Sequence, residues 1–160
     1  MKTILYALAV ILTIAILSCI SKTDGTWLNG DESERTALIE KHFRGFDMAM
    51  AETGYRYQEL YWAGMDENWE YAQYQLTKMK LAIQNGFERR PARKKSAEYF
   101  TEEVIPSMQS VIAEKDIALF SKSFKLMTIQ CNNCHKSENV EFFNVSIPEF
   151  RNSIIKKDIE

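Results

Sequence analysis

The residues best suited to chemistry in this sequence are Cys131-Asn132-Asn133-Cys134-His135, which bring two thiols and an imidazole into five positions. The spacing matches C-x-x-C-H, the pattern that attaches c-type haem covalently. On a helix, residues three and four apart lie on one face, so both thiols can reach the vinyl groups of one porphyrin while the histidine turns toward the iron. The motif therefore predicts a single covalent haem c, held by Cys131 and Cys134, with His135 as an iron ligand.

Three other uses of the two cysteines were weighed against haem attachment. A structural zinc site needs four ligands, whereas this cluster supplies three and His42 is the only other histidine. A thioredoxin-type pair lies at a helix N-terminus after a strand, whereas this pair lies toward the end of a helical pattern. The third alternative is a haem-free interaction bundle with a Cys131–Cys134 disulfide.

The N-terminus predicts export. An apolar run follows Lys2 and ends at Cys19; at about 15 residues it is shorter than the ~20 that cross a bilayer as a helix, and typical of a signal peptide. Ser18-Cys19 resembles the lipobox cut by the lipoprotein signal peptidase. We therefore expect a lipoprotein-type signal peptide at 1–18, lipidation of Cys19 and a tether at 19–32.

An ordinary cleaved signal and an uncleaved anchor are the alternatives to the lipoprotein signal, and all three deliver the rest of the chain outside the cytoplasm. The sequence thus predicts a protein of the periplasm or of the outer face of a bacterial membrane, held there by a lipid anchor. Export agrees with the haem motif, because c-type haem is attached after secretion.

Composition favours one helical domain. The chain has 160 residues, of which 46% are apolar, and only 6 Gly and 3 Pro, too few for the many tight turns of an all-β fold. The net charge of −2 provides no electrostatic footprint for nucleic acid. We therefore expect a globular all-α protein that does not bind nucleic acid.

Apolar residues recur at alternating spacings of three and four in four segments, as in amphipathic helices. Their stripes run over residues 39–60, 69–83, 97–111 and 117–134, and the first helix is expected to extend from Ser33 to Ala63. Short connections make sequential helices antiparallel, so residues 33–160 are predicted to form an up-down-up-down four-helix bundle.

Several residues are expected to limit or interrupt these helices. Gly64 and Asn85-Gly86 are predicted stops. Either Asp66 or Asn68 is the predicted N-cap of the second helix, and Asp116 is the predicted N-cap of the fourth. The long first helix is expected to bend or break near Gly45 or Gly54, and Pro106 is expected to kink the third. After the haem motif, Phe143, Val145 and Ile147 alternate with polar residues up to Pro148, which predicts an extended C-terminal arm.

With these elements, the chain resembles the cytochrome c-prime and cytochrome c-556 group, four-helix bundles that carry C-x-x-C-H near the end of the last helix. The resemblance is architectural and covers residues 35–136. It implies haem c bound by Cys131 and Cys134, with His135 as the proximal iron ligand, and it leaves the opposite side of the iron open.

The distal side of the iron is expected to face the start of the first helix, which an up-down-up-down bundle places beside the end of the fourth. Met50, Phe43 and Phe46 are the candidates on its core stripe. Ligation by Met50 would raise the potential and suit an electron carrier, whereas phenylalanines over the iron would leave it five-coordinate and able to bind NO or CO. His42 and Met48 lie off the stripe and are weaker candidates.

The predicted function is one-electron transfer by an exported monohaem cytochrome, with gas binding and the haem-free bundle as alternatives. No acid/base pair, phosphate loop or nucleophile suggests an enzyme. A redox protein is the expected partner, and the basic segment Arg89–Lys95 is either a solvated loop or a docking site for an acidic partner or an anionic membrane. The sequence is compatible with either a monomer or a homodimer.

Overall fold

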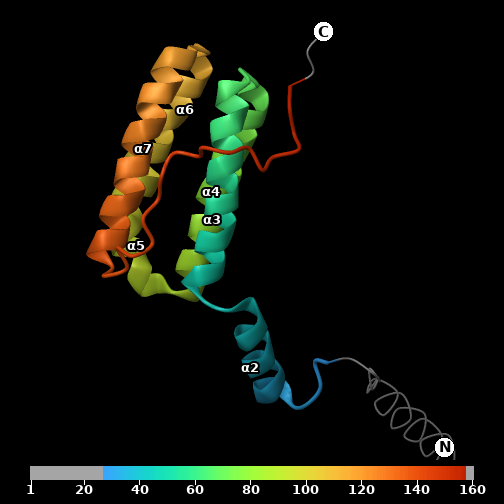
Figure 1. Ribbon diagram of the computed structural model, residues 1–160. Coiled ribbons are helices and arrows are strands. Elements are labelled where there is room, and N and C mark those ends of the chain that lie inside the picture. The colour runs from blue at the N-terminus through green and yellow to red at the C-terminus, as the bar shows by residue number, and fades with distance from the viewer. Residues whose placement is uncertain (1–26, 158–160) are drawn as a thin grey trace, which may run out of the picture. The chain divides into compact units, whose positions relative to one another are not determined.

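The computed structural model describes residues 27–157, and within this range the chain forms helices and connecting segments without a strand (Figure 1). The predicted all-α class is therefore confirmed for the described residues. The predictions for the signal peptide, for Cys19 and for most of the tether concern residues outside this range. The elements are α2 (Glu32–Phe43), α3 (Phe46–Met65), α4 (Trp69–Arg89), a 3-10 turn (Pro91–Arg93), α5 (Lys94–Tyr99), a π-helical turn (Phe100–Val104), α6 (Ile105–Glu114) and α7 (Ile117–Ser137).

The chain divides into two compact units, one ending at His42 and the other beginning at Phe43. In the first unit, α2 buries none of its residues, and the ring of Trp27 lies 4.6 Å from that of His42. The expected break in the long first helix is confirmed, because the chain leaves the helical conformation after α2, where Arg44 adopts a positive φ of 60°. The break falls at Gly45 rather than Gly54, and the helical body begins about ten residues later than residue 33.

The core of the second unit is a set of fully buried side chains from α3, α4, α6 and α7. Each of the largest is at most 2% exposed, and burying such a side chain stabilises the fold by roughly 1.5–3 kcal/mol. The ring of Phe120 packs 5.8 Å from those of Trp69 and Phe124. The largest members are Leu60, Leu76, Met79, Met108, Phe120, Phe124 and Met127.

The predicted N-caps are present. The side chain of Asn68 accepts a hydrogen bond from the backbone N–H of Tyr71 at 3.3 Å, and that of Asp116 accepts from Leu119 at 2.8 Å. Each satisfies a backbone donor that the first turn of a helix leaves without a partner. These caps fix where α4 and α7 begin.

Of the two glycines predicted as helix stops, Gly64 is followed by the end of α3 at Met65, as predicted, whereas Gly86 lies inside α4. A Cβ on Gly64 would lie 2.1 Å from the Phe120 ring, and a Cβ on Gly86 would lie 2.7 Å from that of Ala49. Both glycines therefore serve close helix packing, and α4 continues past Gly86 to Arg89.

The third predicted helix is interrupted directly before Pro106, as expected, by the π-helical turn Phe100–Val104. Proline has no backbone N–H and its ring meets the carbonyl four residues earlier, so the helix widens there. The interruption separates α5 from α6.

After α7 the chain runs without regular structure along α3, where the red trace crosses the helices in Figure 1. The Tyr57 hydroxyl donates to the backbone oxygen of Ser146 at 3.0 Å, and the guanidinium of Arg151 forms an ion pair with Asp66 and lies 4.8 Å from the Trp62 ring centroid. We call residues 140–157 the C-terminal segment. None of the helices between residues 27 and 157 is long and apolar enough to cross a membrane.

Two ends of the helical body differ in burial. We call the end around Gly64, Trp69 and Phe120 the closed end, because Phe120 is fully buried there. We call the end around Phe46 and Cys131 the open end; both residues pack against the core and, like Trp69 at the closed end, remain partly exposed, and neither is fully buried as Phe120 is. The C-x-x-C-H motif lies at the open end.

Candidate functional site

Cys131 and Cys134 lie one turn apart in the last part of α7, and both are free thiols. Cys131 packs against the hydrophobic core, whereas Cys134 lies beside Arg93 of the 3-10 turn and Ser96 of α5. The two sulfurs are thus set between the core and the α5 side of the fold.

Burial raises the pKa of both thiols. For Cys131 the pKa reaches about 12, chiefly through burial and further through the nearby charge of Cys134. The pKa of Cys134 is also raised by burial, although Ser96 and Arg93 act against the shift. Redox-active cysteine pairs need the opposite, a lowered pKa that produces a thiolate. The electrostatics of this pair do not suit thiol–disulfide exchange.

The imidazole of His135 is oriented by the C-terminal segment. Its Nδ1 lies 2.6 Å from the carbonyl oxygen of Phe143, and because a carbonyl can only accept, Nδ1 carries the proton and donates. In the neutral form of the ring, Nε2 is then the nitrogen that carries the lone pair. Metal-ligating histidines typically use this arrangement, in which the second nitrogen donates to a carbonyl and fixes the ring.

Asn132, inside the motif, holds the segment that orients His135. Its side-chain Nδ2 donates to the carbonyl oxygen of Val145 at 2.9 Å, and its Oδ1 accepts from the backbone N–H of Val145 at 2.7 Å. Two opposed hydrogen bonds fix both the distance and the rotation of the chain two residues beyond Phe143. Residue types alone do not single out Asn132 or a backbone carbonyl, so sequence reasoning missed both.

Contacts between α3 and α7 show which position of α3 lies beside His135 of α7. The Tyr57 hydroxyl lies 2.8 Å from that of Thr128, and the rings of Tyr57 and Tyr61 both contact Phe124. Residue numbers therefore rise along α3 as they fall along α7. Met50, two turns before Tyr57, consequently lies level with the position two turns after Thr128, which is His135.

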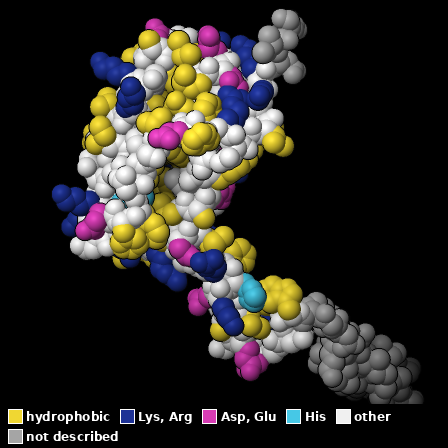
Figure 2. Space-filling model, in the orientation of Figure 1, with side chains coloured by type: hydrophobic (Ala, Val, Ile, Leu, Met, Phe, Trp, Pro, Cys, Tyr) yellow, Lys and Arg dark blue, Asp and Glu magenta, His cyan; other side chains and the backbone are white. Residues whose placement is uncertain are grey.

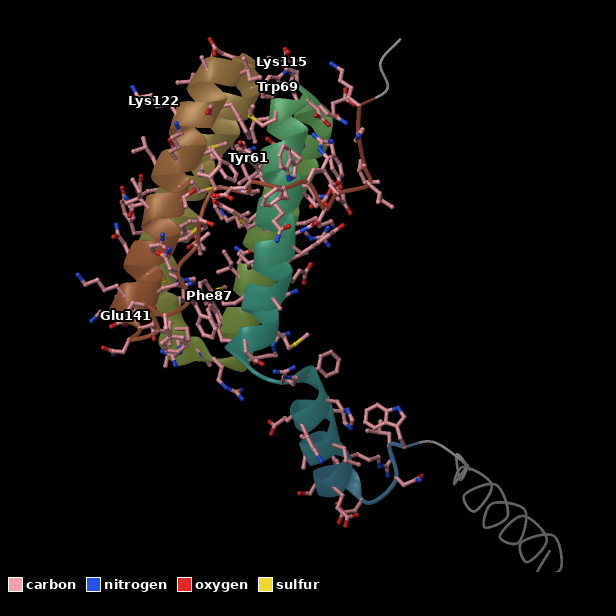
Figure 3. All side chains as sticks on the ribbon, in the orientation of Figure 1. Tyr61, Trp69, Phe87, Lys115, Lys122 and Glu141 are labelled. Carbon is pink, nitrogen blue, oxygen red and sulfur yellow. The ribbon has the colours of Figure 1, made fainter. Side chains whose placement is uncertain are left out.

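The three distal candidates differ in their surroundings. Met50 and Phe46 are partly buried against the core, and the Phe46 ring stacks on Phe87 with centroids 6.0 Å apart. Phe87 points from α4 toward the side formed by α5 and α7 (Figure 3). Phe43 ends α2 and is 61% exposed, and no described contact brings it to the motif.

The surface beside the motif is hollowed between α3 and α7, below the place where the C-terminal segment crosses (Figure 2). A groove of about 430 Å³ lies between α3 and the C-terminal segment, lined by Gly54, Tyr57, Gln58, Val145–Phe150 and Asn152. The wall nearest the motif is apolar, since Val145 and Ile147 pack against the core.

The donor set fits one metal chemistry better than others. Within residues 27–157, no three His, Cys, Asp or Glu side chains are placed to hold a metal ion by themselves. One histidine and two thiols on the same helix fit instead an iron porphyrin, whose ring nitrogens supply the other iron ligands. Searches against protein-family models, curated proteins and solved structures find no match to this chain.

Proposed function

We propose that this chain is an exported c-type cytochrome that transfers single electrons. One haem would be bound through thioether bonds to Cys131 and Cys134 and through Nε2 of His135. The observation that carries the proposal is the hydrogen bond from His135 Nδ1 to the Phe143 carbonyl, because it prepares the other ring nitrogen for a metal immediately after a C-x-x-C pair.

The fold proposed for this function is an up-down-up-down four-helix bundle with an extended C-terminal arm, the architecture of the cytochrome c-prime and cytochrome c-556 group. The opposed order of contacts along α3 and α7 supports it. In this arrangement the motif at the end of α7 lies beside the start of α3, and the arm covers the bundle next to the motif.

Each residue of the site has a distinct task. A bound haem supplies reversible one-electron chemistry at its iron. Cys131 and Cys134 would hold the porphyrin through their thiols, and His135 would supply a lone pair to the iron. The Phe143 carbonyl keeps Nδ1 protonated and increases electron donation from Nε2, while Asn132 holds the carbonyl in place. The apolar core beside Cys131 excludes water, which tunes the potential.

On the distal side we propose Met50 as the sixth ligand, because the contacts between α3 and α7 set it level with His135. A thioether ligand favours the reduced iron and suits an electron carrier. The stacked pair Phe46 and Phe87 favours the second candidate function, in which apolar rings cover a five-coordinate iron that binds NO or CO.

The test is the visible spectrum of the ferrous protein, purified from a host that matures c-type haem, with and without CO. A haem that survives denaturation and low-spin bands that ignore CO are expected, and Met50→Ala should make the bands CO-sensitive. Met48→Ala is the matched control and should change nothing. A high-spin spectrum shifted by CO in the unmodified protein would instead establish gas binding, and a colourless protein would contradict the proposal.

Delivery to a membrane is a separate part of the proposal. Residues 1–18 would direct export, a lipid on Cys19 would anchor the mature chain at the outer face of a membrane or in the periplasm, and residues 19–32 would tether it. Cys19→Ala should move the protein from the membrane fraction to the soluble fraction on cell fractionation. Membrane retention of this variant would contradict lipid anchoring and leave the haem site unaffected.

A further inference from the structure

A cluster of cations lies beside the proposed haem site without taking part in it. Arg89–Lys95 contains five cations in seven residues. The guanidinium of Arg93 forms an ion pair with Glu138 at the end of α7, and the Ser96 hydroxyl donates to the same carboxylate, 42 residues away in sequence. These contacts fix the basic segment next to Cys134.

An apolar pair adjoins the same place. Phe142 and Phe143 are 72% and 62% exposed, their ring centroids are 4.5 Å apart, and the carbonyl of Phe143 is the one that orients His135. Two neighbouring exposed aromatic rings next to cations match the apolar centre and charged rim of protein-binding surfaces.

The local charge is positive although the chain is not. The net charge is −2, yet the acidic groups next to the motif are outnumbered: Glu138 is engaged by Arg93, and Glu88, Glu98 and Glu141 are exposed. Arg90, Arg93, Lys94 and Lys95 are exposed around them, and Lys136 adds a further cation on α7. A partner that approaches this end therefore meets cations around an apolar patch.

From this juxtaposition we infer that the surface formed by Arg89–Lys95, Phe142 and Phe143 is the docking surface for an acidic one-electron carrier protein. The inference rests on the proposed function. In the exchange, the reduced partner loses one electron and the ferric iron gains it, becoming ferrous. A protein fits this surface better than an anionic membrane, because a bilayer covering the motif end would keep a second protein away from it.

The first test is binding, which needs no electron transfer. Oxidised flavodoxin serves as the acidic carrier, and its affinity is measured by titration calorimetry with the protein as purified. Lys94→Glu with Lys95→Glu should weaken binding about tenfold or more, the scale of electrostatic steering. Acidic residues suit the first turn of α5, so the fold is kept.

The matched control makes the same charge change at the other end of the helices. Lys115→Glu with Lys122→Glu, both labelled in Figure 3, should alter binding less than about twofold. Equal effects of the two double variants, or none from either, would overturn the inference. This outcome is independent of haem attachment, so the inference and the proposed function fail separately.

The second test is the salt dependence of electron exchange in the haem-loaded protein. Oxidation of the ferrous protein by hexacyanoferrate(III), an anion, should slow as ionic strength rises, because the local cations attract the reagent. The net charge of −2 alone would give the opposite trend. Slowing by anionic phosphatidylglycerol vesicles, with none by phosphatidylcholine vesicles, would assign the surface to a membrane and overturn the inference.

Discussion

The closed and open ends of the helical body are formed by the same helices but differ in how far their apolar side chains are buried. At the closed end Phe120 is fully buried beside Gly64 and Trp69, so the chain completes its own core. At the open end Phe46 and Cys131 pack against that core and stay partly exposed. An apolar, flat group attached at Cys131 would cover these surfaces, which is what we propose.

The largest effect is expected from filling space at the closed end. Gly64→Ala should destabilise the protein by about 2 kcal/mol, because its Cβ would meet the ring of Phe120, which is fully buried. Urea unfolding measures the change.

Gly54→Ala is the matched control in the same helix, since nothing lies within 4 Å of its Cβ. It should be neutral or stabilise by about 0.5–1 kcal/mol, the gain in helix propensity. Equal losses in both variants would show that the closed end is not tightly packed.

A smaller effect is expected at the open end from Asn132→Ala. The variant loses both hydrogen bonds to Val145 and should lose about 1–2 kcal/mol in the free energy of unfolding. Because the segment that orients His135 is released, the iron potential measured by redox titration should also change.

Asn133→Ala is the control for Asn132, since Asn133 is exposed and bonds only to Gln130 one turn away. It should leave the potential unchanged. If both substitutions change the potential equally, the proposal that Asn132 helps to orient His135 is contradicted.

The smallest effect is expected in the pH dependence of the free energy of unfolding, through Tyr57 between the two ends. Burial raises the pKa of Tyr57 from 10.0 to about 12, with the Thr128 hydroxyl acting against the shift. The folded-state pKa lies above the unfolded value, so this contribution is complete below pH 10 and is lost as pH rises toward 12.

Tyr57→Phe should therefore flatten the fall in stability at alkaline pH, measured by urea unfolding as a function of pH. The exposed Tyr74 supplies the control, and Tyr74→Phe should leave the slope unchanged. An unchanged slope in Tyr57→Phe would contradict the assignment.

How far the sequence predicts the molecule depends on which end is considered. The stripe containing Leu76, Met79, Phe120 and Phe124 predicts the core, because helical periodicity reports burial directly. The sequence predicts a helix stop at Gly86 and is wrong there, since a glycine that admits a neighbouring helix looks the same in sequence as one that ends its own.

The open end was predicted less completely. The motif identifies Cys131, Cys134 and His135 by residue type and spacing, but the partner of His135 Nδ1 is a backbone carbonyl eight residues later, which no side chain reveals. The expected stripe through Ile39 and Phe43 does not form a core, because none of the residues of α2 is buried among the residues that the structure describes. Periodicity marks an apolar face and says nothing about whether a partner surface exists.

Intact-mass and peptide-mapping mass spectrometry of the protein from a haem-c-maturing host tests the central claim most directly. The account predicts a mass increase of one haem, confined to the peptide that contains Cys131 and Cys134, and its loss in Cys131→Ser with Cys134→Ser. A mature protein whose mass carries no haem, with these two cysteines as free thiols or as a disulfide, would contradict it.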